Sequence, residues 1–193
     1  ADTVRPEARG AVERLQGAGV EIMMLTGDVE SAAQRIARRT GITRVRAEVS
    51  PGEKADVIGA LRKEGRVVAM VGDGINDAPA LATADVGVAM GSGTDVALVT
   101  GDVALVGDSL RAVETLLRIS RAAHRNIVQN LVGAFIYNVI GIPIAAGALY
   151  PALGLRLSPM IAGAAMALSS VTVVANANRL RHWRPRGMER RRN

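Results

Sequence analysis

Hydrophobic positions follow two different patterns along the chain. Through about residue 125, short apolar runs alternate with amphipathic stretches, and charged residues recur every few positions. Beyond that point lie two uncharged runs, residues 130–150 and 157–178, which contain 21 and 22 residues. The first pattern is typical of a soluble domain and the second of membrane helices. We therefore expect two parts that contact different solvents.

The first part has the periodicity of an α/β domain. Strand-like apolar runs and helix-like amphipathic stretches alternate, which predicts a doubly wound parallel sheet with helices on both faces. In such sheets ligands bind at the carboxyl ends of the strands. The expected helices are 4–16, 29–39, 53–64 and a short one ending near residue 83, and the expected strands are 20–25, 43–47, 67–71, 86–90 and 103–106.

The second part predicts a membrane hairpin. Each uncharged run has the ~20 residues that a helix needs to cross a hydrocarbon core of ~30 Å. A helix from residue 109 leads into the first run, and the connection at 150–156 is short. Arginines cluster outside the two runs, and Arg156 alone lies between them. Because cytoplasmic flanks carry the excess of Arg and Lys, we expect both ends in the cytoplasm. A pair of buried helices in a soluble protein is the alternative, although no charge interrupts either run.

Net charge and cysteine content change this picture little. The formal charge of +6 would suit a nucleic-acid binder, but seven arginines directly follow the second apolar run, where cytoplasmic flanking charge belongs. We therefore expect no nucleic-acid partner. Without Cys the chain has no disulfide and no thiolate metal site. It opens on Ala1 instead of Met and without a signal-peptide pattern, so we interpret the sequence as a piece of a longer protein.

Candidate phosphate-binding residues follow the predicted strands. Asp73 and Asp77 come directly after an apolar strand, in the string GDGIND, where glycines allow a sharp turn close to an anion. Two carboxylates there suit Mg²⁺. Thr26 ends another strand, and Lys54 opens a helix and offers a compact positive charge to phosphate. Taken singly, each has a structural explanation as a turn, a helix cap or a solvated side chain.

These residues lie in strings that resemble a known family. The strings MLTGD at 24–28, VSPGEK at 49–54, VGDGINDAPAL at 71–81 and GSGTD at 91–95 resemble consecutive motifs of the haloacid dehalogenase-like phosphorylation domain of P-type ATPases. The resemblance implies that Asp73 ligates Mg²⁺ beside Asp77. It also implies that Thr26 and Lys54 contact the transferred phosphoryl group. The catalytic residues that it implies are Thr26, Gly27, Asp28, Lys54, Asn76 and Asp77.

Two parts of that family are absent from the chain. The phosphorylated aspartate of the family stands in the string DKTGT, which does not occur here, and the nucleotide-binding domain is also missing. Val99 stands where the family usually has an acidic residue. We therefore expect this chain on its own not to hydrolyse ATP. A membrane-tethered phosphatase of the haloacid dehalogenase type would need its own nucleophile, and a non-catalytic membrane module is the other alternative.

The predicted membrane helices contain polar residues, which are costly at that depth and often functional. Tyr137 and Asn138 lie near the middle of the first run, and Pro143 is expected to kink it. Met166 and Ser170 are one turn apart in the second run, and a thioether suits Cu(I). Ordinary helix packing explains the same residues, because small and polar side chains line membrane helix contacts.

The same runs resemble the last two helices of copper(I)-transporting members of the heavy-metal class. By that resemblance Tyr137, Asn138, Met166 and Ser170 take part in the transmembrane copper site. The resemblance implies a pump that uses ATP and Mg²⁺ to export Cu(I), embedded in a bacterial plasma membrane. Its partners would be lipid, the N-terminal remainder of the same pump and a copper chaperone. The implied domains are a partial phosphorylation domain at 1–108, a linking helix at 109–129, two transmembrane helices at 130–178 and a basic tail at 179–193.

Overall fold

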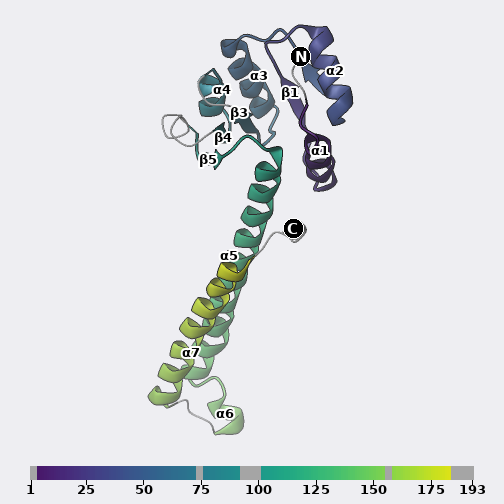
Figure 1. Cartoon of the computed structure of the whole chain (residues 1–193). Coiled ribbons are helices and arrows are strands. Elements are labelled where there is room, and N and C mark those ends of the chain that lie inside the picture. The colour runs from purple at the N-terminus through teal and green to yellow at the C-terminus, as the bar shows by residue number, and fades with distance from the viewer. Residues whose placement is uncertain (1–3, 73–75, 92–100, 155–157, 184–193) are drawn as a thin grey trace, which may run out of the picture. The chain divides into compact units, whose positions relative to one another are not determined.

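The computed structural model describes residues 4–72, 76–91, 101–154 and 158–183. It divides the chain into two compact units, Ala1–Thr115 and Leu116–Asn193. The first unit contains short parallel strands and the helices around them, and the second contains helices (Figure 1). Helix α5 (Leu110–Ala145) begins in the first unit and continues into the second without interruption. The units are therefore joined by regular helix.

The strands of the first unit are parallel, as the alternation of elements predicts. β1 (Met23–Leu25) pairs with β2 (Arg44–Arg46), and β3 (Ala69–Gly72), β4 (Val86–Gly91) and β5 (Val103–Val106) follow one another in a second sheet. The expectation of one continuous sheet was wrong for the described residues, because no ladder joins β1 to β3. β1 has three residues, half of the stretch predicted as strand, which leaves few backbone groups for a second neighbour.

Local sequence signals explain where the helices of this unit end. Gly41 closes one helix in the left-handed conformation, with φ of 81°, which costs glycine nothing. Pro51 occupies the first turn of another, where its missing N–H has no helical partner to lose. The predicted helices all form, with boundaries shifted by a few residues. They are α1 (Ala8–Gly17), α2 (Glu30–Thr40), α3 (Pro51–Lys63) and α4 (Ala78–Thr83).

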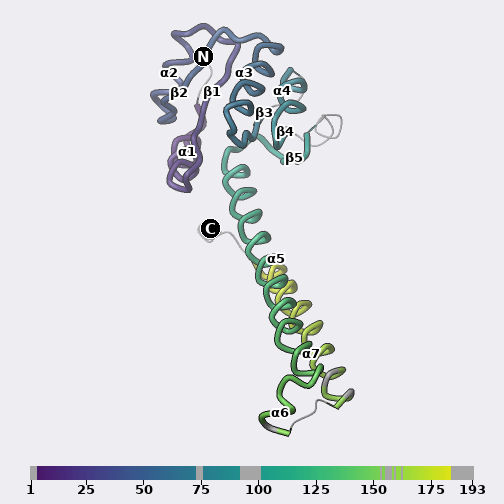
Figure 2. The backbone as a smooth tube through the Cα atoms, turned by 180° about the vertical axis from the view of Figure 1, so that it is seen from behind, coloured from purple at the N-terminus to yellow at the C-terminus, as the bar shows by residue number. Residues whose placement is uncertain are grey.

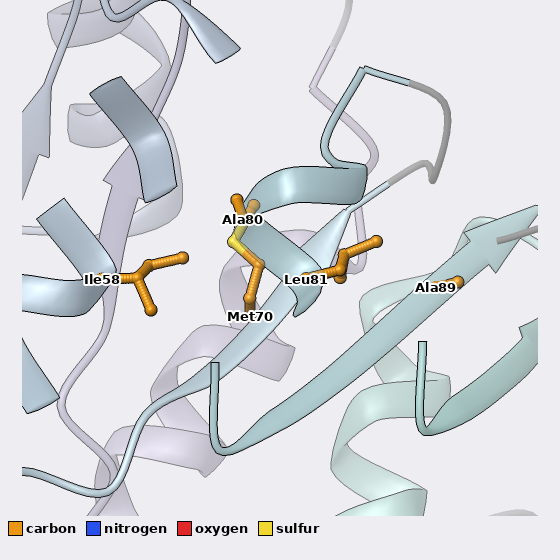
Figure 3. Packing of buried hydrophobic residues seen from close by; sticks show 5 residues of the cluster. All are labelled: Ile58, Met70, Ala80, Leu81 and Ala89. Carbon is orange, nitrogen blue, oxygen red and sulfur yellow. The ribbon is translucent and has the colours of Figure 1, made fainter. Parts of the chain in front are cut away.

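A small core joins the second sheet to α3 and α4. Figure 3 shows its buried members, one or two from each element: Ile58, Met70, Ala80, Leu81 and Ala89. Leu25, the last residue of β1, packs against the same cluster. The carboxyl end of β1 is therefore held near α3 and β3 by shared apolar contacts, even though no strand pairing connects them.

The second unit contains the two predicted membrane runs as helices. α5 covers nearly all of the predicted linking helix and the first run up to Ala145, two residues beyond Pro143, which leaves the last five residues of that run outside the helix. After the short α6 (Tyr150–Leu153), the second run forms α7 (Pro159–Asn178), followed by the 3-10 helix η2 (Arg179–His182). In both views α7 runs back alongside α5 (Figure 2). Among the described residues, α5 alone meets the length and composition expected of a membrane-crossing helix, and its apolar stretch is not buried.

Gly87 tests how tightly the second sheet is packed. It is buried in β4, and its N–H donates to the carboxylate of Asp102 at 2.8 Å. A Cβ at this position would lie 2.8 Å from the carbonyl oxygen of Leu81, so the backbone of β4 or of α4 would have to move. We expect Gly87→Ala to lower the free energy of unfolding of this unit by about 1–3 kcal/mol. Hydrogen exchange of the β4 amides measures the effect.

Gly17→Ala is the matched control. Gly17 is exposed in the last turn of α1, and a Cβ there would have no neighbour within 4 Å. Since alanine favours helix by up to ~1 kcal/mol over glycine, this variant should keep or raise the protection of β4. Equal β4 protection in the Gly87 and Gly17 variants would show that the contact with Leu81 does not constrain the sheet.

Candidate functional site

Lys54 and Asp77 form an ion pair between the beginnings of two helices. Lys54 lies in the first turn of α3, and Asp77 is the residue directly before α4. The lysine Nζ donates to Asp77 Oδ1 at 2.7 Å, and their side chains are 14% and 13% exposed. Charges in so little water interact more strongly than on an open surface. The structure thus brings together two of the residues that sequence reasoning assigned to the phosphate site.

The position of Asp77 depends on Gly72, the last residue of β3. A Cβ on Gly72 would lie 2.7 Å from the Cβ of Asp77 and 2.9 Å from its Cγ. Real Cβ atoms do not approach so closely, so only glycine lets the aspartate side chain lie against the end of this strand. The carboxylate is therefore placed at the carboxyl edge of the parallel sheet, where ligands bind in α/β folds.

The position of Lys54 depends on a capping box at the start of α3. The hydroxyl of Ser50 accepts from the backbone N–H of Glu53, and the Glu53 carboxylate accepts in return from the Ser50 N–H at 2.8 Å. The Ser50 hydroxyl and then its backbone N–H lower the pKa of Glu53 below its ordinary value, because both donate to the ionised carboxylate. This box satisfies two helix-end donors and fixes the turn that presents Lys54.

A second polar turn follows β1. The hydroxyl of Thr26 donates to Asp28 Oδ2 at 3.0 Å and accepts from the Asp28 N–H at 3.1 Å. The backbone carbonyls of the same two residues accept from Val49 and Glu48, which lie just before α3. Gly27, between them, is exposed. The turn therefore presents a hydroxyl and an accessible backbone at another strand end.

The structure gathers the predicted phosphate-site residues only partly. In the described part of the chain, no hydrogen bond joins the Thr26 turn to the Lys54–Asp77 pair, although Leu25 packs in the core that also contains residues of α3 and β3. Asn76 is exposed, and Asp73 lies outside the described residues. Sequence reasoning missed the roles of Gly72 and of the capping box. The string S-x-x-E at residues 50–53 was a signal that could have revealed the box.

The residues assigned to a copper site lie on α5 and α7 with much of their surface open. Tyr137 is 40% and Met166 is 71% exposed, and Asn138 is exposed as well. The hydroxyl of Ser170 donates to the carbonyl of Met166 at 3.2 Å, which holds these two residues on one face of α7. Over the residues that the structure describes, no hydrogen bond connects these residues of α7 to Tyr137 or Asn138.

Comparison with known proteins matches both units. A family model described as haloacid dehalogenase-like hydrolase matches residues 1–85. The chain is 57% identical over 186 residues to the probable copper-transporting ATPase PacS of Synechococcus elongatus, which covers 96% of the chain and 25% of that protein. It is also 57% identical over 181 residues to a copper-exporting P-type ATPase of Vibrio cholerae, covering 94% of the chain and 20% of that protein.

A solved structure of another metal-transporting ATPase also matches nearly the whole chain. The crystal structure of a zinc-transporting PIB-type ATPase in its E2.Pi state matches with a TM-score of 0.80 and 40% identity, over 93% of this chain and 28% of that one. The chain thus spans a fifth to a quarter of the length of the curated relatives. The chain is homologous to the C-terminal stretch of copper-transporting P-type ATPases, and its residues 1–85 match the haloacid dehalogenase-like family.

Proposed function

We propose that the protein containing this chain is an ATP-driven pump that exports Cu(I) from the cytosol. In it the chain supplies residues of the phosphate site and part of the transmembrane copper path. The observation that carries the proposal is the Lys54–Asp77 pair at the sheet edge, in a chain that is 57% identical to proteins named as copper transporters. Phosphoryl transfer is catalysed mainly by positioned positive charge and hydrogen-bond donors.

Each phosphate-site residue has a role that its surroundings support. Lys54, held by Asp77 and largely shielded from water, would offset charge on the phosphoryl oxygens. The hydroxyl of Thr26 would turn its one proton from Asp28 Oδ2 to the same oxygens, and the backbone N–H of Gly27 would donate to them as well. Asp28 would still hold the Thr26 turn, because its backbone N–H donates to the Thr26 hydroxyl. Asn76, exposed beside Asp77, would help to order the loop.

The donor chemistry at the end of β3 suits Mg²⁺. That ion binds one or two carboxylates and takes its other ligands from water and phosphate oxygens. Asp77 lies at this strand end with its Oδ1 bound to Lys54, and Asp73 directly follows Gly72 in the sequence. We assign the ligand role to Asp73, with Asp77 beside it. When bound, Mg²⁺ would neutralise charge that develops on the transferred group.

For the membrane part we propose that α5 and α7 both cross the bilayer as a hairpin with its two ends in the cytoplasm. Arginines lie outside the uncharged runs on both sides, which supports this orientation. The membrane would be a bacterial plasma membrane, and a copper chaperone would deliver the ion. Tyr137, Asn138, Met166 and Ser170 would line the copper path. With Met166 71% exposed, the described residues of this chain do not enclose such a path, so further helices of the pump would complete it.

The choice of copper over zinc rests on two supports. The relatives at 57% identity are named for copper, whereas the matching structure named for zinc is 40% identical. The side chains in the proposed path are also neutral, with a soft thioether at Met166, and soft ligands favour Cu(I). A site for a harder divalent ion would be expected to include carboxylates or imidazoles.

Gly72→Ala tests the phosphate site without removing any functional group. The added methyl must displace the Asp77 side chain and with it the partner of Lys54. We expect ATP turnover by the complete pump to fall by about a hundredfold, the order that a ~1 Å misplacement of a catalytic group costs. Copper affinity of the unphosphorylated protein should stay unchanged. The control is Gly59→Ala in α3, whose Cβ would meet only an ordinary contact at 3.9 Å. Equal turnover in the two variants would refute the placement of Asp77.

Met166→Leu tests the copper path. Leucine keeps the volume and the hydrophobicity, so packing should change by less than about 1.5 kcal/mol, while the soft sulfur is lost. We expect Cu(I) affinity, measured by competition with a chelator, to fall by roughly tenfold or more. Met160→Leu is the matched control, because Met160 is another largely exposed methionine, at the start of the same helix. If both variants bind Cu(I) as the wild type does, Met166 is not a ligand.

A further inference from the structure

Three asparagines form a hydrogen-bonded cluster between α5 and α7. Asn126 donates through its amide to the backbone carbonyl of Asn176 at 2.7 Å. Asn176 donates through its own amide to Asn130 Oδ1 at 2.9 Å, and Asn130 donates to Asn126 Oδ1 at 3.2 Å. The three bonds form a closed ring, two of them running from one helix to the other. We call Asn126, Asn130 and Asn176 the asparagine cluster.

Each asparagine of this cluster donates one hydrogen bond and accepts at least one from another residue of the cluster. Arg179 donates to Asn176 Oδ1 at 3.1 Å, which turns the amide N–H₂ of Asn176 towards Asn130. The carbonyl of Asn176, in the last turn of α7, already accepts from a backbone N–H at the C-terminal end of that helix. Asn126, 8% exposed and the one buried residue of α5 in the described chain, supplies a second donor to the same oxygen. The cluster thus joins the end of one helix to a side chain of the other.

The cluster fixes the level at which the antiparallel helices meet. Asn176 bonds to both Asn126 and Asn130, so it lies level with the midpoint between them, near residue 128. Asn138 is ten residues beyond that midpoint on α5, and Met166 is ten residues before Asn176 on α7. At 1.5 Å per residue, both lie ~15 Å from the cluster in the same direction. The register set by the asparagines therefore places Met166 level with Asn138 and its neighbour Tyr137.

Little else on these helices would hold that register. Between the cluster and the distal ends of the helices, most side chains are apolar or small and exposed, and the hydroxyls of Ser170 and Thr172 donate within α7 itself. In a bilayer the hydrophobic effect does not favour one apolar contact over another, so hydrogen bonds and close packing decide how helices align. A slip of one helical turn would move Met166 by ~5.4 Å relative to Asn138. Such a displacement exceeds what a shared metal site tolerates.

We propose that Asn126, Asn130 and Asn176 are positioning residues that set the register of α7 against α5. Through that register they bring the thioether of Met166 to the depth of Tyr137 and Asn138. The effect of this register on copper binding rests on the proposed function, whereas the register itself does not. None of the three asparagines contacts the metal in this account. They act ~15 Å away, through the helices.

The register can be measured directly because the chain contains no Cys. Ala134→Cys with Ser169→Cys places two thiols on half-buried positions within one residue of the same level, and Ala134→Cys with Val173→Cys places them three residues out of register. In the full 193-residue chain in lipid vesicles, a short bifunctional thiol reagent should cross-link the level pair in preference. With Asn126 and Asn176 both changed to Ala, the preference should fall by several-fold towards equal yields, since each interhelical bond contributes a factor of roughly three.

Two further variants keep this test decisive. Asn130→Ala removes two bonds of the ring and leaves the bond from Asn126 to Asn176, so it should weaken the preference even if the double variant fails to fold. Asn178→Ala is the control, because Asn178 is an exposed asparagine two residues from Asn176 on the same helix. It should leave the preference at the wild-type value. Unchanged preference in the folded Asn130 variant would overturn the proposal.

A second arm separates this inference from the copper assignment. In the complete pump, Asn130→Ala should lower Cu(I) affinity by roughly threefold, and Asn178→Ala should leave it unchanged. Lost register with full Cu(I) affinity would overturn the positioning role. If the wild type binds no Cu(I), the proposed function fails, and the cross-linking preference alone then decides whether the asparagine cluster sets the register.

Discussion

The ion pair between Lys54 and Asp77 is the contact on which the candidate site depends. It joins the first turn of α3 to the residue before α4, at the end of β3. Each partner is placed by a separate local device, the capping box for Lys54 and the missing side chain of Gly72 for Asp77. Because both charges are largely shielded from water, loss of either would leave the other poorly compensated. The pair links α3 to α4, and its lysine is the positive charge that we propose acts on phosphate.

The amino-acid sequence predicted the elements well and their long-range pairing less well. Helix ends follow from local signals such as Gly41 and Pro51, whose effects act within one turn. The split into two sheets depends on which strands find partners, and apolar patterning does not specify this. Lys54 and Asp77 could be assigned to one site from motifs, but their direct contact across 23 positions could not be derived from spacing. Gly72 looked like a turn residue, and its close approach to Asp77 appears only in three dimensions.

The asparagine cluster illustrates the same limit in the second unit. Asn126 directly follows Arg125 at the end of an amphipathic stretch, and Asn130 begins the first uncharged run, so neither position by itself indicates a partner. Their partner Asn176 is at least 46 positions away, so no local pattern pairs them. Yet the direction and length of two regular helices follow from sequence, and one contact between them then fixes the level of every other residue. A few hydrogen bonds near the end of α7 thereby set the level of Met166 relative to α5.

The most direct test of the account is the metal dependence of phosphorylation in the complete protein that contains this chain. Membranes with that protein would be given ATP labelled on its terminal phosphate, with Cu(I) or with Zn²⁺, and the acid-stable phosphoprotein would be measured. The account predicts labelling that requires Mg²⁺, rises with Cu(I) and does not rise with Zn²⁺. Labelling that responds to Zn²⁺ and not to Cu(I), or no phosphoprotein under either condition, would contradict it.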